Sequence, residues 1–232
     1  MEVVSIETGR ATWLFPTEEF VPLGGIDGTV IIQRVAERYQ FKNFPQSPTR
    51  EETDKNGLKF LTGIFEFQGK KAGIDEFALY NDGIVVVSNT TEHSNAFLDD
   101  LFGFLVKGFQ FRRPSSSIKK VYVSILTVEF ENPIGLMLAN QAALMSLVGE
   151  YLNAPQGTAH NVELTRVDFA LDDSAIASSA RPKLILESRA TVPLSRRRYL
   201  SNAAMHTKDH LELLSEIEET FMRPSTTGLS GI

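Results

Sequence analysis

Two clusters of basic side chains are the residues of this chain best suited to bind an anionic group. The first cluster contains Arg112, Arg113, Lys119 and Lys120. The second contains Arg189, Arg196, Arg197 and Arg198, with Arg181 and Lys183 before them and Tyr199 directly after. A guanidinium group binds phosphate or carboxylate through parallel hydrogen bonds, and a tyrosine ring can stack on a base. If the clusters meet in space, they form a patch for an acidic protein, a nucleotide or RNA. Otherwise they are solvated surface, the interpretation that we favour.

A glycine-rich segment before the first expected helix is a candidate phosphate loop. It contains Gly24, Gly25, Gly28 and Thr29. A helix N-terminus offers free N–H groups, and glycines let a phosphate approach closely. The segment lacks the lysine of a P-loop and the glycine spacing of a dinucleotide-binding turn, and its Asp27 would repel a phosphate. We therefore favour a turn followed by a helix N-cap at Asp27 or Thr29.

His206 and His210 are four residues apart, which would place both imidazoles on one face of a helix. Such a pair can share a metal ion with a carboxylate. The next position on that face is Leu214, however, and Thr207 stands where the metalloprotease pattern requires glutamate. We expect two surface or packing histidines and no metal site.

Three aspartates near the middle of the second half, Asp168, Asp172 and Asp173, suggest a magnesium site. In a strand, however, Asp168 and Asp172 lie ~13 Å apart, which is too far for one ion to bridge. We expect Val167, Phe169 and Leu171 to face the core and the aspartates to face solvent.

Composition indicates a folded protein with a phenylalanine-rich core. The chain has 232 residues, of which 42% are hydrophobic and 22% charged, and it contains 16 Phe and one Trp. It has no cysteine, which excludes disulfides and thiolate chemistry and fits a reducing cytosol. Because we find neither a secretory signal nor an apolar run of ~18 residues, we expect a cytoplasmic protein without membrane contact. The net charge of −6 argues against broad wrapping of nucleic acid but permits a local basic patch.

Hydrophobic periodicity predicts the elements of the first half. Strands are expected over 10–15, 58–67, 72–80 and 84–88, and helices over 28–40 and 94–107. Asn81-Asp82-Gly83 predicts a hairpin with a type I′ turn. Ser94 is the expected cap of the second helix, and the polar segment 41–57 is expected to be an exposed loop.

The second half is expected to contain three strands and two helices. The strands cover 118–130, 162–171 and 182–191, and the helices cover 133–152 and 207–221. We interpret helix 133–152 as buried and the stretch after Pro193 as irregular. Thr207 is the expected cap of the last helix, whose leucine-rich face predicts docking on its own sheet or on a partner.

These elements predict an α+β fold, with a mainly antiparallel sheet, helices packed on it and two pseudo-repeated β-α-β(2-3)-α units. The expected halves are 1–111 and 112–223, which can form one continuous domain, followed by a flexible tail at 224–232. A short echo supports the repeat, because Ile74-Asp75-Glu76-Phe77-Ala78-Leu79 resembles Val167-Asp168-Phe169-Ala170-Leu171. Ordinary α+β alternation is the competing interpretation.

No catalytic signature is present, so the preferred hypothesis is a non-catalytic binding or assembly subunit of a cytosolic complex, without a cofactor. It would act on a protein partner or as a homo-oligomer through the 41–57 loop, the second basic cluster or the final helix. The first alternative is a nucleotide- or nucleic-acid-binding regulator that uses the arginines. The second is an enzyme for which we can assign no nucleophile or base.

Overall fold

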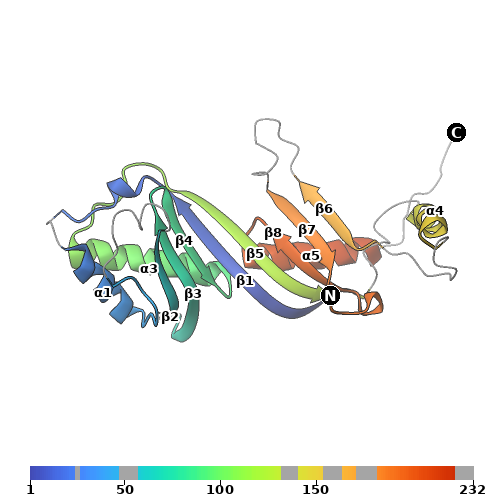
Figure 1. Ribbon diagram of the computed structural model, residues 1–232, viewed down its shortest axis with the longest axis horizontal. Coiled ribbons are helices and arrows are strands. Elements are labelled where there is room, and N and C mark those ends of the chain that lie inside the picture. Colours follow the sequence, from blue (N-terminus) through green and yellow to red (C-terminus); the bar gives the residue numbers. More distant parts are fainter. Residues whose placement is uncertain (24–26, 47–56, 132–140, 154–163, 171–181, 223–232) are drawn as a thin grey trace. The chain divides into compact units, whose positions relative to one another are not determined.

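The computed structural model describes residues 1–23, 27–46, 57–131, 141–153, 164–170 and 182–222 (Figure 1). The strands are β1 (Glu2–Leu14), β2 (Leu58–Phe67), β3 (Lys70–Tyr80), β4 (Gly83–Ser88), β5 (Lys119–Glu129), β6 (Arg166–Ala170), β7 (Lys183–Ser188) and β8 (Arg198–Ala203). The helices are α1 (Gly28–Arg38), α3 (Thr91–Phe109), α4 (Gln141–Asn153) and α5 (Thr207–Met222), with short 3₁₀ turns η1 (Thr17–Glu19) and η4 (Leu194–Arg196). The strands form one eight-stranded antiparallel sheet in the order β2-β3-β4-β1-β5-β8-β7-β6, which confirms the α+β class.

The described elements follow a similar order in the two halves of the chain. β1-α1-β2-β3-β4-α3 is followed by β5-α4-β6-β7-β8-α5, and the two sets of strands follow the same order from the centre of the sheet outward. β8 lies in the stretch expected to be irregular. Its buried residues are Tyr199, Ser201 and Ala203, and this alternation of buried positions is hard to recognise directly after three arginines. The short sequence echo does not follow this order. It aligns β3 with the edge strand β6, whereas β7 is the strand that takes the place of β3 in the second set. A duplicated origin stays a prediction.

The chain divides into two compact units, which we describe separately. The N-terminal unit comprises Ile6–Ile125 with Ala204–Thr207, and the C-terminal unit comprises Met1–Ser5, Leu126–Ala203 and Lys208–Ile232. The segment 204–207 belongs to the N-terminal unit, where Thr207 is bonded to Thr91. The Thr91 N–H donates to the Thr207 hydroxyl at 3.0 Å, and the Thr207 N–H donates to the Thr91 hydroxyl at 2.7 Å.

Phenylalanine rings dominate the core of the N-terminal unit, as the composition predicts. Phe97 of α3 lies at its centre, with ring centroids 4.7 Å from Tyr39, 5.6 Å from Phe65 and 5.7 Å from Phe77. α3 packs on β2 and β4, so one face of these strands is covered (Figure 1). Large aromatic side chains bury much apolar area each, and this packing holds α1, α3 and the sheet together.

The helix caps were predicted correctly at one helix and wrongly at another. Asp27 caps α1, as its side chain accepts a hydrogen bond from the Thr29 N–H at 2.9 Å. α3 begins three residues before the predicted Ser94, with Thr90 as its cap. Ser94 is instead buried inside the helix and donates to the Gly9 carbonyl at 2.7 Å. A serine that can bond to a neighbouring strand does not have to end a helix.

The β3–β4 hairpin is confirmed, but its turn is not of type I′. Neither Asn81 nor Asp82 has a positive φ angle. Positive φ angles occur instead in the β2–β3 turn, at Gln68 (51°) and Gly69 (75°). This pair has positive φ angles at both central positions, as a type I′ turn requires, so the turn expected between β3 and β4 has its backbone between β2 and β3 instead.

The C-terminal unit has a smaller described core, formed by Leu126, Val128, Phe130, Leu186, Tyr199 and Leu214. α5 docks on this core through Leu214 and Ile217, as predicted for a leucine-rich face. The buried interpretation of α4 is wrong for its described part, since Leu147, Tyr151 and Leu152 are all more than half exposed. Phe169 is also 48% exposed, against the prediction that it faces the core. Apolar composition alone does not say whether a neighbouring element covers a side chain.

Several predictions fall wholly or partly on residues outside the described ranges. They concern Gly24, Gly25, Asp172, Asp173, Arg181, the start of helix 133–152 and the tail 224–232. The loop prediction over 41–57 is wrong at its start, because Phe41 is buried and Asn43 bridges to Leu61 of β2. Among the described helices, we find none that combines the length and the apolar character needed to cross a membrane.

Candidate functional site

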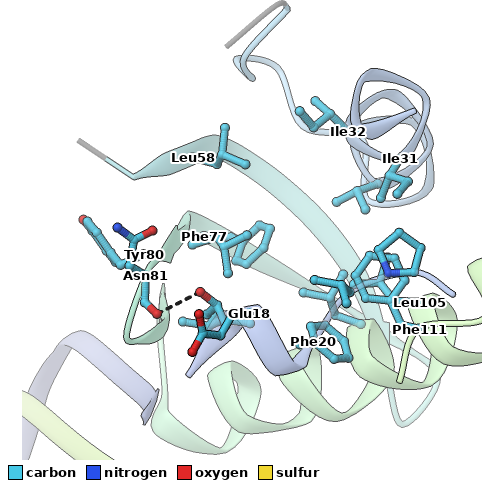
Figure 2. Close-up of a pocket in the computed structure, with 18 of the residues that line it drawn as sticks. Glu18, Phe20, Ile31, Ile32, Leu58, Phe77, Tyr80, Asn81, Leu105 and Phe111 are labelled. Carbon is cyan, nitrogen blue, oxygen red and sulfur yellow. Dashed lines mark hydrogen bonds between the residues drawn. The ribbon is translucent and has the colours of Figure 1, made fainter. Parts of the chain in front are cut away.

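An open apolar cavity of about 840 Å³ lies in the N-terminal unit between α1, η1, α3 and the β2–β4 strands; we call it the α1 pocket. Figure 2 shows Ile31 and Ile32 of α1 facing a wall that includes Leu58 and Phe77. The other apolar lining residues include Phe20, Val35, Phe60, Leu79, Ile84, Leu101, Leu105 and Phe111. A cavity of this size and lining is typical of ligand-binding sites.

A hydrogen-bonded cluster at the C-terminal end of α1 fixes this helix over the pocket. The Tyr39 hydroxyl donates to Asp100 of α3 at 2.7 Å, and Arg38 donates to both Asp100 oxygens at 3.1 Å. Burial and the Asp100 carboxylate raise the pKa of Tyr39, so its hydroxyl stays a donor at neutral pH. α1 is therefore anchored at one end by directed contacts, while part of its apolar face lines the cavity.

Replacing Tyr39 by phenylalanine is expected to lower the free energy of unfolding by about 1 kcal/mol, because one hydrogen bond to a charged acceptor is lost while Asp100 keeps Arg38. Chemical denaturation measures the effect. Tyr80→Phe is the matched control, since the Tyr80 hydroxyl forms no hydrogen bond within the described chain. Equal stability losses in the two variants would contradict an anchoring role for the Tyr39 hydroxyl.

Polar groups occupy one side of the pocket, next to the β3–β4 turn. Thr17 donates its hydroxyl to the Asn81 carbonyl at 2.9 Å, which ties η1 to the turn. Figure 2 labels Glu18, Tyr80 and Asn81 on this side. Glu18 is the one charged side chain among the described lining residues, and it forms no hydrogen bond or ion pair with another described residue.

The neighbouring Glu19 has a different task. One of its carboxylate oxygens accepts four hydrogen bonds, from the backbone N–H and the hydroxyl of both Ser115 and Ser116. These bonds lower the pKa of Glu19, with the Ser116 N–H as the main cause. Glu19 therefore holds the loop before β5, and its carboxylate is already hydrogen-bonded, in contrast to that of Glu18.

The described lining of the α1 pocket is mostly apolar, with Thr17, Glu18, Tyr80 and Asn81 as its polar side chains. It includes no histidine, lysine or arginine. The sequence predictions missed this site, because Ile31 reads as an ordinary core position of an amphipathic helix. Only packing reveals that Ile31 is half-buried and borders a cavity.

Two arginines of the second basic cluster are bonded within the C-terminal unit. Arg198 forms an ion pair with Glu129 at 2.9 Å, and Arg189 donates to the Thr127 hydroxyl at 3.1 Å. Tyr199 is only 3% exposed and packs on Phe130, so the expected stacking on a base is wrong for this conformation. The alternation of β8 turns the Tyr199 ring into the core.

Arg196 and Arg197 have no ion pair within the described chain, and both line a second cavity of about 500 Å³. The same cavity is lined by three carboxylates, those of Glu2, Glu129 and Glu131. These acids offset the positive charge, so this geometry favours a mixed-charge surface over a phosphate site.

The first basic cluster belongs to the N-terminal unit. Arg112 and Arg113 are exposed and directly follow Phe111 of the pocket lining, and the Arg112 N–H donates to the Val21 carbonyl at 3.1 Å. Lys120 lies over the ring of Trp13, with its ammonium nitrogen 3.9 Å from the centroid, and Lys119 is exposed. Since the two clusters lie in different units, their convergence stays a prediction.

The candidate phosphate loop is described only from Asp27 onward. Gly28 is the first residue of α1, and the Asp27 carboxylate already accepts the Thr29 N–H. This carboxylate satisfies one of the free donors that a phosphate would use and also carries the same charge as a phosphate. The observed part of the loop therefore agrees with the turn and N-cap interpretation.

The two histidines have unrelated environments. His206 precedes α5, stacks on Tyr122 with 3.7 Å between ring centroids, and lies 4.0 Å from the Glu92 carboxylate. His210 is fully buried, and its Nε2 lies 2.7 Å from the Ser201 hydroxyl. Over the described ranges, no three histidine, aspartate or glutamate side chains are grouped as metal ligands.

Asp168 is exposed and bound to Arg166 at 2.8 Å, as expected for a solvated aspartate rather than a metal ligand. The hydrogen bond from Arg166 is the main cause that lowers the pKa of Asp168. Arg166 also contacts Glu187 of β7 at 3.2 Å, so this group ties the edge strand to its neighbour.

Comparison with known proteins adds no relative. No family model matches the sequence, and no curated protein matches it significantly.

Proposed function

We propose that this protein is a non-catalytic binding protein whose α1 pocket receives an apolar side chain of a protein partner. The observation that carries the proposal is the open cavity of about 840 Å³ with aromatic and aliphatic walls. Anchor side chains that fill such pockets supply much of the binding energy at protein interfaces.

Apolar surface around the pocket supports a protein partner rather than a small enclosed ligand. Val21, Leu23 and Val30 are 44%, 61% and 46% exposed, and each is a lining residue or lies next to one in the sequence. A small molecule inside the cavity would leave these side chains in water. A protein segment that enters the pocket and continues across its rim would cover them, as in an interface with an apolar centre.

Ile31→Asp is expected to weaken partner binding at least tenfold, or about 1.4 kcal/mol, because it places a carboxylate against the apolar wall. Short random peptides displayed on phage would be selected on the full chain, and the affinity of the enriched peptides measured by isothermal titration calorimetry. The expected peptides share a large apolar residue and compete with one another for one site.

Gln33→Asp is the matched control, because Gln33 is an exposed residue of the same helix that does not line the pocket. Circular dichroism establishes that both variants are folded. Selected peptides that bind Ile31→Asp as tightly as the unmodified chain would refute the α1 pocket as the binding site.

A further inference from the structure

We infer that the partner segment carries a lysine or arginine beside its apolar anchor, and that Glu18 is the residue that selects it. This inference rests on the proposed function and names the chemistry of the partner. Glu18 is the one charged side chain among the described residues that line the pocket. Glu18 is exposed and forms no ion pair with another described residue, so its carboxylate can accept a cation that a partner brings.

The position of Glu18 is defined by its neighbours. Thr17 bonds to the Asn81 carbonyl through both its hydroxyl, at 2.9 Å, and its N–H, at 3.2 Å. On the other side, Glu19 is held by Ser115 and Ser116. With its two neighbours anchored, Glu18 stays at one edge of the cavity, close to the turn that Asn81 belongs to (Figure 2). An anchored backbone lowers the entropy that must be lost when a partner binds.

The charge at the rim of the pocket favours a basic residue of the partner. Glu18 is exposed at the edge of the apolar cavity, and Asp82 follows the lining residue Asn81 in the sequence. A lysine or arginine can lay its aliphatic stem on an apolar wall while its charged end reaches a carboxylate at the edge. A basic residue beside the apolar anchor is therefore the partner chemistry that this rim fits.

Peptide selections on three forms of the full chain test this inference. With the unmodified chain, lysine or arginine is expected next to the apolar anchor. With Glu18→Gln, the basic preference is expected to disappear while the anchor remains. With Glu18→Lys, an acidic residue should replace the basic one. Glu66→Gln, an exposed glutamate of β2 outside the pocket lining, is the matched control and should leave the basic preference intact.

The size of the effect follows from exchanging lysine for glutamate beside the anchor of one selected peptide. Affinity for the unmodified chain should fall about three- to tenfold, and the difference should shrink from about 50 mM to about 500 mM salt. A basic preference that persists in Glu18→Gln, or tighter binding of the acidic peptide to the unmodified chain, would overturn the role of Glu18. If peptides selected on the unmodified chain show no basic preference but bind Ile31→Asp more weakly, the role of Glu18 fails and the proposed function stands. If their binding is insensitive to Ile31→Asp, both fail.

Discussion

Replacing Gly9 by alanine is expected to lower the free energy of unfolding by about 3 kcal/mol or more. Backbone atoms of Thr90 and Thr91 would lie closer than 3.0 Å to the added Cβ, at the point where α3 begins. The Gly9 carbonyl also accepts the Ser94 hydroxyl at 2.7 Å, and Ser94 is bonded to Ser88 at 2.9 Å. The new methyl group would push β1 away from α3 and break a buried set of hydroxyl bonds.

Gly103→Ala is the matched control for this prediction. Gly103 lies within α3, and a Cβ there meets no atom within 4 Å. Alanine in a helix interior is favoured over glycine by roughly 0.5–1 kcal/mol, so this variant should gain stability. Urea denaturation of both variants measures the difference. A Gly9→Ala protein as stable as the unmodified chain would show that β1 and α3 are not in this close contact.

Acidification is expected to destabilise the C-terminal unit through His210. Burial lowers the pKa of His210 from 6.5 to about 4, since the charged ring would lie in an apolar core. Between these values the unfolded chain binds a proton that the folded chain excludes. The contribution of a neutral His210 to stability is therefore complete above about pH 7 and is lost as the pH falls to about 4. The loss is about 3 kcal/mol for this one group.

His210→Gln isolates this contribution, because glutamine can still form a hydrogen bond with the Ser201 hydroxyl and does not titrate. The free energy of unfolding would be measured by denaturant titration from about pH 7.5 to about pH 4 for the unmodified and variant chains. Titration of the carboxylates is common to both and cancels in the difference. On acidification, the free energy of unfolding of the variant should fall by about 3 kcal/mol less than that of the unmodified chain.

Asn202→Gln serves as the control, since Asn202 is a half-buried residue of β8 next to Ser201 and does not titrate. This variant should keep the pH dependence of the unmodified chain. If His210→Gln kept it as well, the buried imidazole would not be the cause of the acid sensitivity.

Elements that depend on local periodicity were predicted closely. β2 was expected over 58–67 and is observed at the same residues, and α1 begins within its predicted range with Asp27 as cap. Each of these elements carries its own pattern of buried and exposed positions, together with a turn or cap at its end. Such signals act between residues that are close in the chain, so they can be recognised without knowledge of the fold.

Predictions that depended on the packing of another element failed. Tyr199 was a candidate to stack on a base, but pairing with β7 turns its ring into the core. Ser94 was expected to cap a helix, whereas the approach of β1 gives it the Gly9 carbonyl as a partner. α4 was expected to be buried because it is apolar, and it exposes Tyr151. In each case the environment is set by whether and how another element packs against the residue.

The sequence by itself therefore determined the α+β class, the phenylalanine-rich core and the approximate positions of most helices and strands. Periodicity, capping and turn chemistry are local and leave a direct pattern in the chain. Tertiary structure alone decided that Ile31 and Glu18 border one cavity, that His210 is buried beside Ser201, and that Arg198 is paired with Glu129. A cavity is the space left when several elements pack imperfectly against one another, so no single segment of the sequence encodes it.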